Sequence, residues 1–172
     1  MNSPQPKQIE ALIKHYNLLP HPEGGFFRQT YAAAEQISKE ALPERFEGSR
    51  SFSTAIYFLL THGSFSAFHR IKSDEVWHFY EGCPLHIHVI HPNGQYDCMK
   101  LGGNMTNGES YQLVVPANAW FASEPVGEPE SFALVGCTVA PGFDFSDFEL
   151  AEAEVLVNQF PLHQQLIKRL CH

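Results

Sequence analysis

The chain has 172 residues, close to the ~150 that one domain typically takes, so we expect a single domain spanning residues 1–172. Charged residues make up 17% of the chain and aromatic residues 13%, a balance that excludes a disordered protein. The formal net charge of −8 leaves too few cations for a nucleic-acid polymer or an anionic membrane surface as partner. No apolar run reaches the ~18 residues of a membrane span, and residues 1–8 do not resemble a signal peptide. We therefore expect a cytoplasmic protein.

An amphipathic helix is predicted first, over residues 6–19, because Ile9, Leu12, Ile13 and Tyr16 fall on one helical face. Two prolines end it, and residues 26–31 have the composition of a strand. Residues 32–49 show no periodicity, so we expect a mobile surface loop there.

The middle of the chain contains many short β-forming runs separated by turn signals such as Asn93-Gly94 and Asn107-Gly108. The predicted strands are 51–60, 64–71, 75–80, 85–90, 96–101, 110–115 and 131–139. This cadence, without interleaved helices, predicts a mainly β protein built as an antiparallel sandwich or barrel. Two helices are expected at the end, over residues 148–157 and 162–170.

The polar residues most able to carry chemistry gather in residues 69–82. A carboxylate such as Glu75 can orient the imidazole of His69 and raise its basicity, which suits a general base, or the two can supply metal ligands. The alternative is that both are solvated residues at the rim of the barrel. Strand alternation places Glu75, Trp77 and Phe79 on one face and His78 on the other, so Glu75 and His78 share a cavity only if the strand is irregular.

Three further groups of residues could carry chemistry. Glu23 and Arg28 bracket Gly24-Gly25, where Arg28 could clamp an anion or form a structural contact with Glu23. His86 and His88 share a strand face, but the intervening apolar residues are expected to face the core, which turns both histidines outward. The four cysteines have no CxxC spacing and are expected to be free thiols packed as small hydrophobes.

Several segments together resemble the cupin-5 family of the cupin superfamily. Gly63, His69, Glu75 and Gly82 resemble the first cupin motif, and Gly108 followed by residues 115–120 resembles the second. The family-like segments are HPEGGFFRQTY, RSFSTAIYFLL, FHRIKSDEVWHFYEG, VPANAWFAS and VGCTVAPGFDFSDFEL, which run from residue 21 to residue 150. The resemblance implies a cupin-type double-stranded β-helix, or jelly-roll barrel, with helices at both ends.

The sequence departs from metal-binding cupins at two of the four expected ligand positions. Ile71 stands where a second histidine would be, and no imidazole lies near Trp120-Phe121. Two ligands do not hold a first-row metal tightly, so no cofactor is expected beyond a weakly bound divalent metal. If a metal is held, its ligands would be His69, Glu75 and His78.

The resemblance also implies a small-molecule pocket in the barrel mouth. We expect its lining to be aromatic, from Trp77, Phe79, Trp120 and Phe121, with Glu23, Arg28 and His78 as further ligand-binding residues. The leading hypothesis is a metal-independent isomerase or epimerase acting on a carbohydrate-like or nucleotide-sugar substrate. His69 would be the base, Glu75 its orienter, and Tyr57 or Tyr80 a proton donor.

Two alternatives remain open: a non-catalytic protein that binds a small metabolite, and, less favoured, a metal-dependent cupin enzyme. The resemblance further implies a homodimer or higher homo-oligomer, because cupins commonly pair their barrels.

Overall fold

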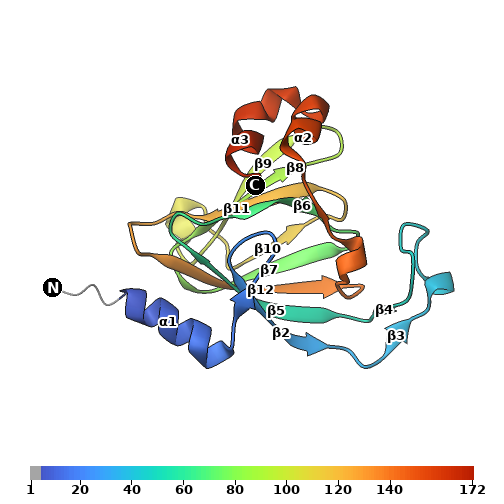
Figure 1. Cartoon of the computed structure of the whole chain (residues 1–172), viewed down its shortest axis with the longest axis horizontal. Coiled ribbons are helices and arrows are strands. Elements are labelled where there is room, and N and C mark those ends of the chain that lie inside the picture. Colours follow the sequence, from blue (N-terminus) through green and yellow to red (C-terminus); the bar gives the residue numbers. More distant parts are fainter. Residues whose placement is uncertain (1–4) are drawn as a thin grey trace.

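The computed structural model describes residues 5–172 and contains two antiparallel sheets that face each other (Figure 1). The six-stranded sheet has the order β1-β2-β5-β12-β7-β10, and the five-stranded sheet has the order β13-β6-β11-β8-β9. The strands of the first sheet are β1 (Leu19–Pro20), β2 (Phe26–Ala32), β5 (Thr54–Thr61), β12 (Phe132–Ala140), β7 (Asp74–Gly82) and β10 (Gln112–Val115). Those of the second are β13 (Glu149–Leu150), β6 (Ser66–Arg70), β11 (Trp120–Pro125), β8 (Leu85–Ile90) and β9 (Tyr96–Leu101).

The main hydrophobic core lies between these two sheets. Side chains that alternate inward along the strands, among them Phe58, Trp77, Ile87, Phe121 and Val135, are almost completely buried there. The strand alternation predicted for residues 85–90 is confirmed, because Leu85, Ile87 and Val89 enter this core.

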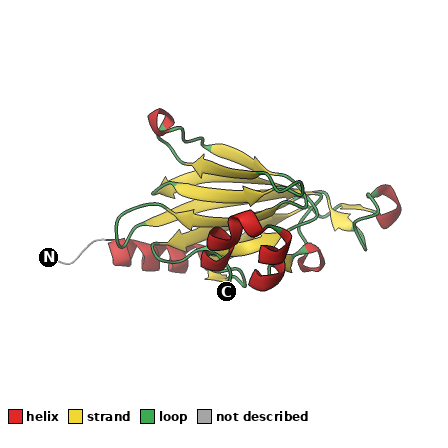
Figure 2. Ribbon diagram, turned by 90° about the horizontal axis from the view of Figure 1, so that it is seen from above, coloured by secondary structure: helices red, strands yellow, loops and turns green. Residues whose placement is uncertain are grey.

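Helices lie at both ends of the chain, as expected (Figure 2). The first, α1 (Gln5–Tyr16), packs its apolar stripe against Leu59, Phe132 and Leu134 on the outer side of the six-stranded sheet. The last two, α2 (Ala153–Gln159) and α3 (Gln164–Arg169), cover the five-stranded sheet through Leu156, Phe160 and Ile167, among others. Within residues 5–172, no helix is both long enough and apolar enough to span a membrane.

The structure corrects three sequence predictions. Residues 32–49 are not an irregular loop throughout, because β3 (Gln36–Ile37) pairs with β4 (Arg50–Ser51) and Phe46 is fully buried. The strand β11 was not predicted. Residues 149–150 pair with β6 as a strand, so the helix expected from residue 148 begins only at Ala153.

Candidate functional site

A cavity of about 80 Å³ opens between the two sheets. Strands β2, β5, β7 and β12 of the six-stranded sheet form one wall, and β6 of the five-stranded sheet lies across from them. The segment that follows β12, residues 141–148, closes one side with Phe143 and Phe148. The lining residues are His21, Glu23, Phe27, Gln29, Thr54, Ile56, Phe58, His69, Ile71, Glu75, Cys137, Val139, Phe143 and Phe148.

Glu23 enters the cavity because a tight turn precedes β2. The backbone N–H of Gly24 donates to the carbonyl of His21 at 3.0 Å, and Gly24 and Gly25 both adopt positive φ, which glycine tolerates best. A Cβ on Gly24 would collide with the backbone carbonyl of Phe65, so this position accepts no other residue without rearrangement. The N–H of Ala67 donates to the Glu23 carbonyl at 2.8 Å and ties the turn to β6.

His69 is held by contacts at both ring nitrogens. Its Nδ1 lies 2.7 Å from the Ala67 carbonyl oxygen, so Nδ1 carries the proton and donates. Its Nε2 lies 3.2 Å from Oε2 of Glu23, and the other carboxyl oxygen, Oε1, accepts a hydrogen bond from Ser66 Oγ at 2.8 Å. The ring of Phe121 packs against the imidazole with a centroid distance of 4.0 Å. The orienting partners of His69 are therefore Ala67 and Glu23, which corrects the expectation that Glu75 has this role.

Burial shifts the pKa values of Glu23, His69 and His21. It raises the pKa of Glu23 to about 7 and lowers the pKa of His69 and of His21, whose Nδ1 lies 3.5 Å from Oε2 of Glu23. Both ring nitrogens of His69 therefore face protein oxygens, Nδ1 the Ala67 carbonyl and Nε2 the Glu23 carboxyl, and neither faces open space for a ligand.

Glu75 differs from Glu23 because its carboxyl has no fixed partner. It is 8% exposed and lines the cavity from β7. Among residues 5–172 it forms no ion pair, and the nearby Trp77 indole N–H has no hydrogen-bond partner of ordinary geometry, while the Cys137 thiol lies close enough to lower the pKa of Glu75. Burial raises its pKa to about 7, against smaller opposing effects of His69, Cys137 and Trp77.

The structure moves several predicted ligand-binding residues away from the cavity. Phe27 and Gln29 face it, so Arg28 between them points to the opposite face of β2, where its register partner is Tyr57. Arg28 therefore neither reaches an anion in the cavity nor contacts Glu23. His78 also faces outward, where its Nε2 lies 3.0 Å from Thr138 Oγ1, so it cannot join His69 and Glu75 in a metal site.

The two candidate proton donors are also outside. Tyr57 packs on Tyr16 of α1 with a ring-centroid distance of 4.6 Å, and Tyr80 beside it is 51% exposed. Both belong to the outer face of the six-stranded sheet, so the structure does not support their role as donors to a ligand in the cavity.

The expected aromatic lining is also placed differently. Trp77, Phe79 and Phe121 belong to the main core, and Trp120 packs under Arg70 and the C-terminal helices. The aromatic side chains that do line the cavity are Phe27, Phe58, Phe143 and Phe148. Sequence analysis missed these four along with His21, Gln29, Thr54 and Cys137, although alternation along β2 could have identified Phe27 and Gln29.

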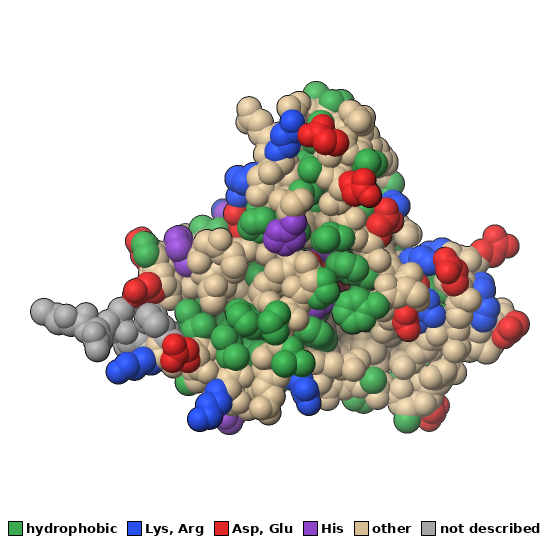
Figure 3. All heavy atoms as spheres, viewed as in Figure 1, with side chains coloured by type: hydrophobic (Ala, Val, Ile, Leu, Met, Phe, Trp, Pro, Cys, Tyr) green, Lys and Arg blue, Asp and Glu red, His purple; other side chains and the backbone are tan. Residues whose placement is uncertain are grey.

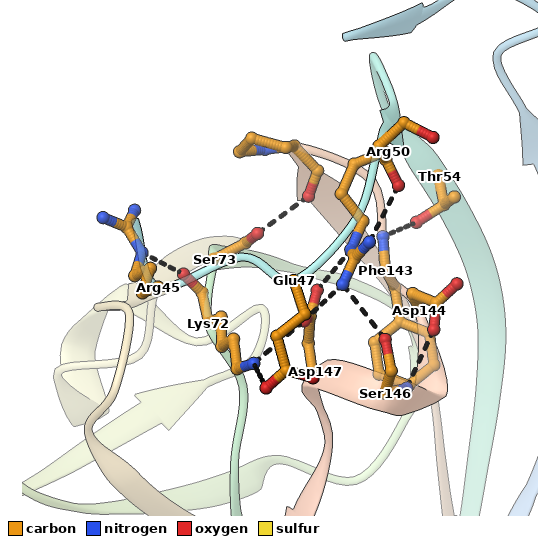
Figure 4. Close-up of polar contacts among 12 residues, drawn as sticks. Arg45, Glu47, Arg50, Thr54, Lys72, Ser73, Phe143, Asp144, Ser146 and Asp147 are labelled. Carbon is orange, nitrogen blue, oxygen red and sulfur yellow. Dashed lines mark hydrogen bonds and ion pairs between the residues drawn. The ribbon is translucent and has the colours of Figure 1, made fainter. Parts of the chain in front are cut away.

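A buried ion pair supports the segment that carries Phe143 and Phe148 (Figure 4). Nε and Nη2 of Arg50 donate to the two carboxylate oxygens of Asp147, each at 2.6 Å, and Nη2 also donates to Ser146 Oγ. Thr54 Oγ1 accepts from the N–H of Phe143 at 2.9 Å. These contacts fix the backbone on both sides of Phe145, which stacks near His21 at the rim.

The metal ligands of a typical cupin do not fit this site. Ile71 lines the cavity where a second histidine was expected, and both nitrogens of His69 are engaged. In residues 5–172, no group of three or more His, Cys, Asp or Glu side chains is arranged to hold a metal ion.

Similarity to solved structures supports the same architecture. Protein SO0799 from Shewanella oneidensis is 36% identical, with a TM-score of 0.85 over 95% of this chain and 96% of that one. A hypothetical protein from Leishmania major is 33% identical, with a TM-score of 0.85 over 95% and 98% of the two chains. Oxalate decarboxylase from Bacillus subtilis, at 14% identity and a TM-score of 0.53 over 88% of this chain and 36% of that one, shares the fold alone. The predicted cupin-type barrel is thereby confirmed.

Sequence comparison identifies the family. The uncharacterized protein YML079W from Saccharomyces cerevisiae is 31% identical over 157 residues, which are 87% of this chain and 78% of that protein. The profile of the Cupin_5 family, described as Cupin superfamily (DUF985), matches residues 10–151. The chain therefore belongs to the cupin-5 family.

Proposed function

We propose that the protein binds a small carbohydrate-like molecule in this cavity and acts on it as a metal-independent isomerase or epimerase. The observation that carries the proposal is Glu75, a buried carboxyl that lines the cavity without a fixed partner. A pKa of about 7 gives Glu75 comparable amounts of the acid and the base near neutral pH, which suits proton transfer in both directions. His69 was the expected base, but Glu75 fits this role better because both nitrogens of His69 are engaged.

The reaction moves one proton at a carbon next to a carbonyl group. The Glu75 carboxylate takes the proton from that carbon, and the electron pair of the broken C–H bond forms a carbon–carbon double bond. The carbonyl π pair moves to oxygen, which receives a proton from the pair formed by Glu23 and His69. Glu75 then returns its proton to carbon, on the other face once the intermediate has turned, or at the neighbouring carbon, which gives the epimer or the isomer. In the same step one hydroxyl of the intermediate gives its proton back to the pair formed by Glu23 and His69, from the enol oxygen for the epimer or from the neighbouring hydroxyl for the isomer, so every group regains its starting protonation.

A non-catalytic binding protein is the competing function, because the same cavity could hold a metabolite without turnover. A metal-dependent enzyme is disfavoured, since the residues around the cavity do not fit the usual ligands. Absence of a tightly bound metal stays a prediction. One equivalent of zinc, iron, nickel or manganese that survives dialysis would contradict it.

Deuterium exchange distinguishes the two functions. A thermal-shift screen of keto-sugars, sugar nucleotides and free nucleotides first identifies a ligand, because a ligand that binds only the folded state raises its stability. The bound ligand is then incubated in D2O, and NMR follows deuterium entering next to its carbonyl group. We expect Glu75→Gln to slow exchange by about 100-fold or more, and Glu44→Gln, at an exposed position, to leave it unchanged.

The possible results of the exchange experiment distinguish catalysis by Glu75 from the alternatives. Exchange at the parental rate in Glu75→Gln would show that the base is assigned wrongly. Binding without exchange in the parent protein would favour the non-catalytic function.

A further inference from the structure

We propose that the cavity accepts only an uncharged group, namely the ketone or aldehyde end of a compact carbohydrate-like molecule, and excludes phosphate and carboxylate groups. This inference rests on the proposed function and names the substrate class of the same site. It excludes substrates that would place a phosphate group inside the cavity.

The charges of the lining residues carry the first part of the argument. The ionisable groups there are two carboxyls, two imidazoles and one thiol, and neither Lys nor Arg is among the fourteen residues that line the cavity within residues 5–172. An anion entering this site would meet Glu23 and Glu75 without a compensating cation. In a buried site of low dielectric constant, such unpaired charge is costly.

Two cations in segments that border the cavity, Arg50 and Lys72, have other partners. Arg50 forms its two-pronged contact with Asp147, and Lys72 Nζ lies 3.3 Å from Glu47 and 3.5 Å from Asp147. Figure 4 shows these side chains directed at one another. Arg28 lies on the other face of β2. No cation of this group is available for an anionic ligand.

The molecular surface agrees with this distribution. In Figure 3, Lys and Arg side chains at the end that carries β3 and β4 are interspersed with Asp and Glu. The middle of the same face, between the two layers, shows mainly hydrophobic side chains. A charged group approaching there gains no electrostatic attraction.

The size of the cavity carries the second part of the argument. Pockets for drug-sized ligands are about 300–1,000 Å³, whereas this one is about 80 Å³. The cavity is thus several times smaller than such pockets and suits a small organic group better than a drug-sized molecule. A three-carbon ketose end fits that size, and the bulk of a sugar nucleotide does not.

The polar groups match a neutral carbonyl compound with hydroxyl groups. The Glu75 carboxyl can accept from a hydroxyl when ionised and donate to a carbonyl oxygen when protonated. Phe27, Phe58, Phe143 and Phe148 offer apolar surface to the carbon skeleton. The site therefore complements a polar but uncharged ligand.

A matched pair of probes tests the inference on the parent protein. Dihydroxyacetone and dihydroxyacetone phosphate differ by one phosphate group, and ligand-detected NMR can measure weak binding of each. We expect dihydroxyacetone to bind in the millimolar range and its phosphate to bind at least about tenfold more weakly. Equal or tighter binding of the phosphate, or no binding of dihydroxyacetone at millimolar concentrations, would overturn the inference.

A second comparison shows whether the probe occupies the cavity. Cys137→Met adds side-chain volume inside the cavity, while Cys98→Met makes the same change at an exposed position on β9. We expect only Cys137→Met to weaken dihydroxyacetone binding. Unchanged binding in a folded Cys137→Met protein would place the ligand elsewhere and refute the inference. If this variant does not fold, the comparison of the two probes on the parent still decides.

Failure of the inference and failure of the proposed function give different results. If dihydroxyacetone binds in preference to its phosphate but no deuterium enters it, the substrate class stands and catalysis fails. If a phosphorylated keto-sugar binds more tightly and does exchange, catalysis stands and the substrate class is wrong.

Discussion

Replacing Glu75 with glutamine should make the protein less sensitive to alkaline pH. Burial raises the pKa of Glu75 from 4.5 to about 7, so in the folded protein the carboxyl keeps its proton at pH values where the unfolded chain has lost it. The stability that this raised pKa contributes is fully present below pH 4.5 and is lost as the pH rises through 7. At about 1.4 kcal/mol per pH unit, the loss amounts to ~3 kcal/mol.

Glutamine has the shape of the protonated glutamic acid and does not ionise. Glu75→Gln should therefore match the parent in free energy of unfolding near pH 4.5 and exceed it by ~3 kcal/mol at pH 8. Urea denaturation of both proteins at several pH values between these limits measures the difference. Glu23, His21 and His69 titrate in both proteins, so most of their contribution cancels in the subtraction.

The control is Glu44→Gln, which changes the same atoms at an exposed site. Its difference from the parent should stay within about 0.5 kcal/mol at every pH. If the advantage of Glu75→Gln does not grow with pH, the Glu75 carboxyl is ionised in the folded protein throughout this range. The argument for Glu75 as a two-way proton carrier would then fail.

Further predictions concern the supports of the cavity and the assembly. Arg50→Met should lower the free energy of unfolding in urea by about 3 kcal/mol, because the buried Asp147 carboxylate loses its two-pronged partner and keeps only Lys72 at 3.5 Å. Lys168→Met, which removes an exposed ion pair, should cost under about 1 kcal/mol, and equal costs would contradict the reasoning. Gly24→Ala should destabilise the protein by at least about 1 kcal/mol more than Gly63→Ala, since both positions have positive φ but only Gly24 has no room for a Cβ; similar losses would show that backbone conformation alone matters. The expected homo-oligomer should exceed the monomer mass of 19.4 kDa in light scattering, and a mass equal to it would refute this prediction.

Two strands, residues 85–90 and 96–101, lie within the bounds that the sequence predicts. In the first, Leu85, Ile87 and Val89 alternate with histidines, and in the second, exposure alternates along the strand. The strand β11 escaped because residues 120–123 are all buried, so apolar and polar residues do not alternate there. Residues 149–150 were assigned to a helix because pairing with β6 is a tertiary contact that local propensity does not reveal.

The site was predictable only where a single strand determines it. Alternation along β7 separates Glu75 from His78, and the same rule applied to β2 would have turned Arg28 away from the cavity. The contact between Glu23 and His69 joins residues far apart in the sequence, through a turn and a strand of different sheets. Nothing in the local pattern of either segment specifies that contact. Cys137 and Phe148 also line the cavity because of tertiary packing that the local sequence does not specify.

The energetics of Glu75 connect the fold to the proposed chemistry. A carboxyl whose pKa is raised by burial lowers the stability of the protein by ~3 kcal/mol at alkaline pH relative to acidic pH. The carboxyl of Glu23, on the turn before β2, contacts His69 and accepts a hydrogen bond from Ser66. Glu75 forms no comparable contact that would offset the cost of its burial. A glutamine or an apolar residue would serve the fold better at that position. A buried carboxyl facing a small cavity without a cation is useful when a neutral ligand must gain or lose a proton, so the proposed function, if the exchange experiment supports it, would account for the position of Glu75.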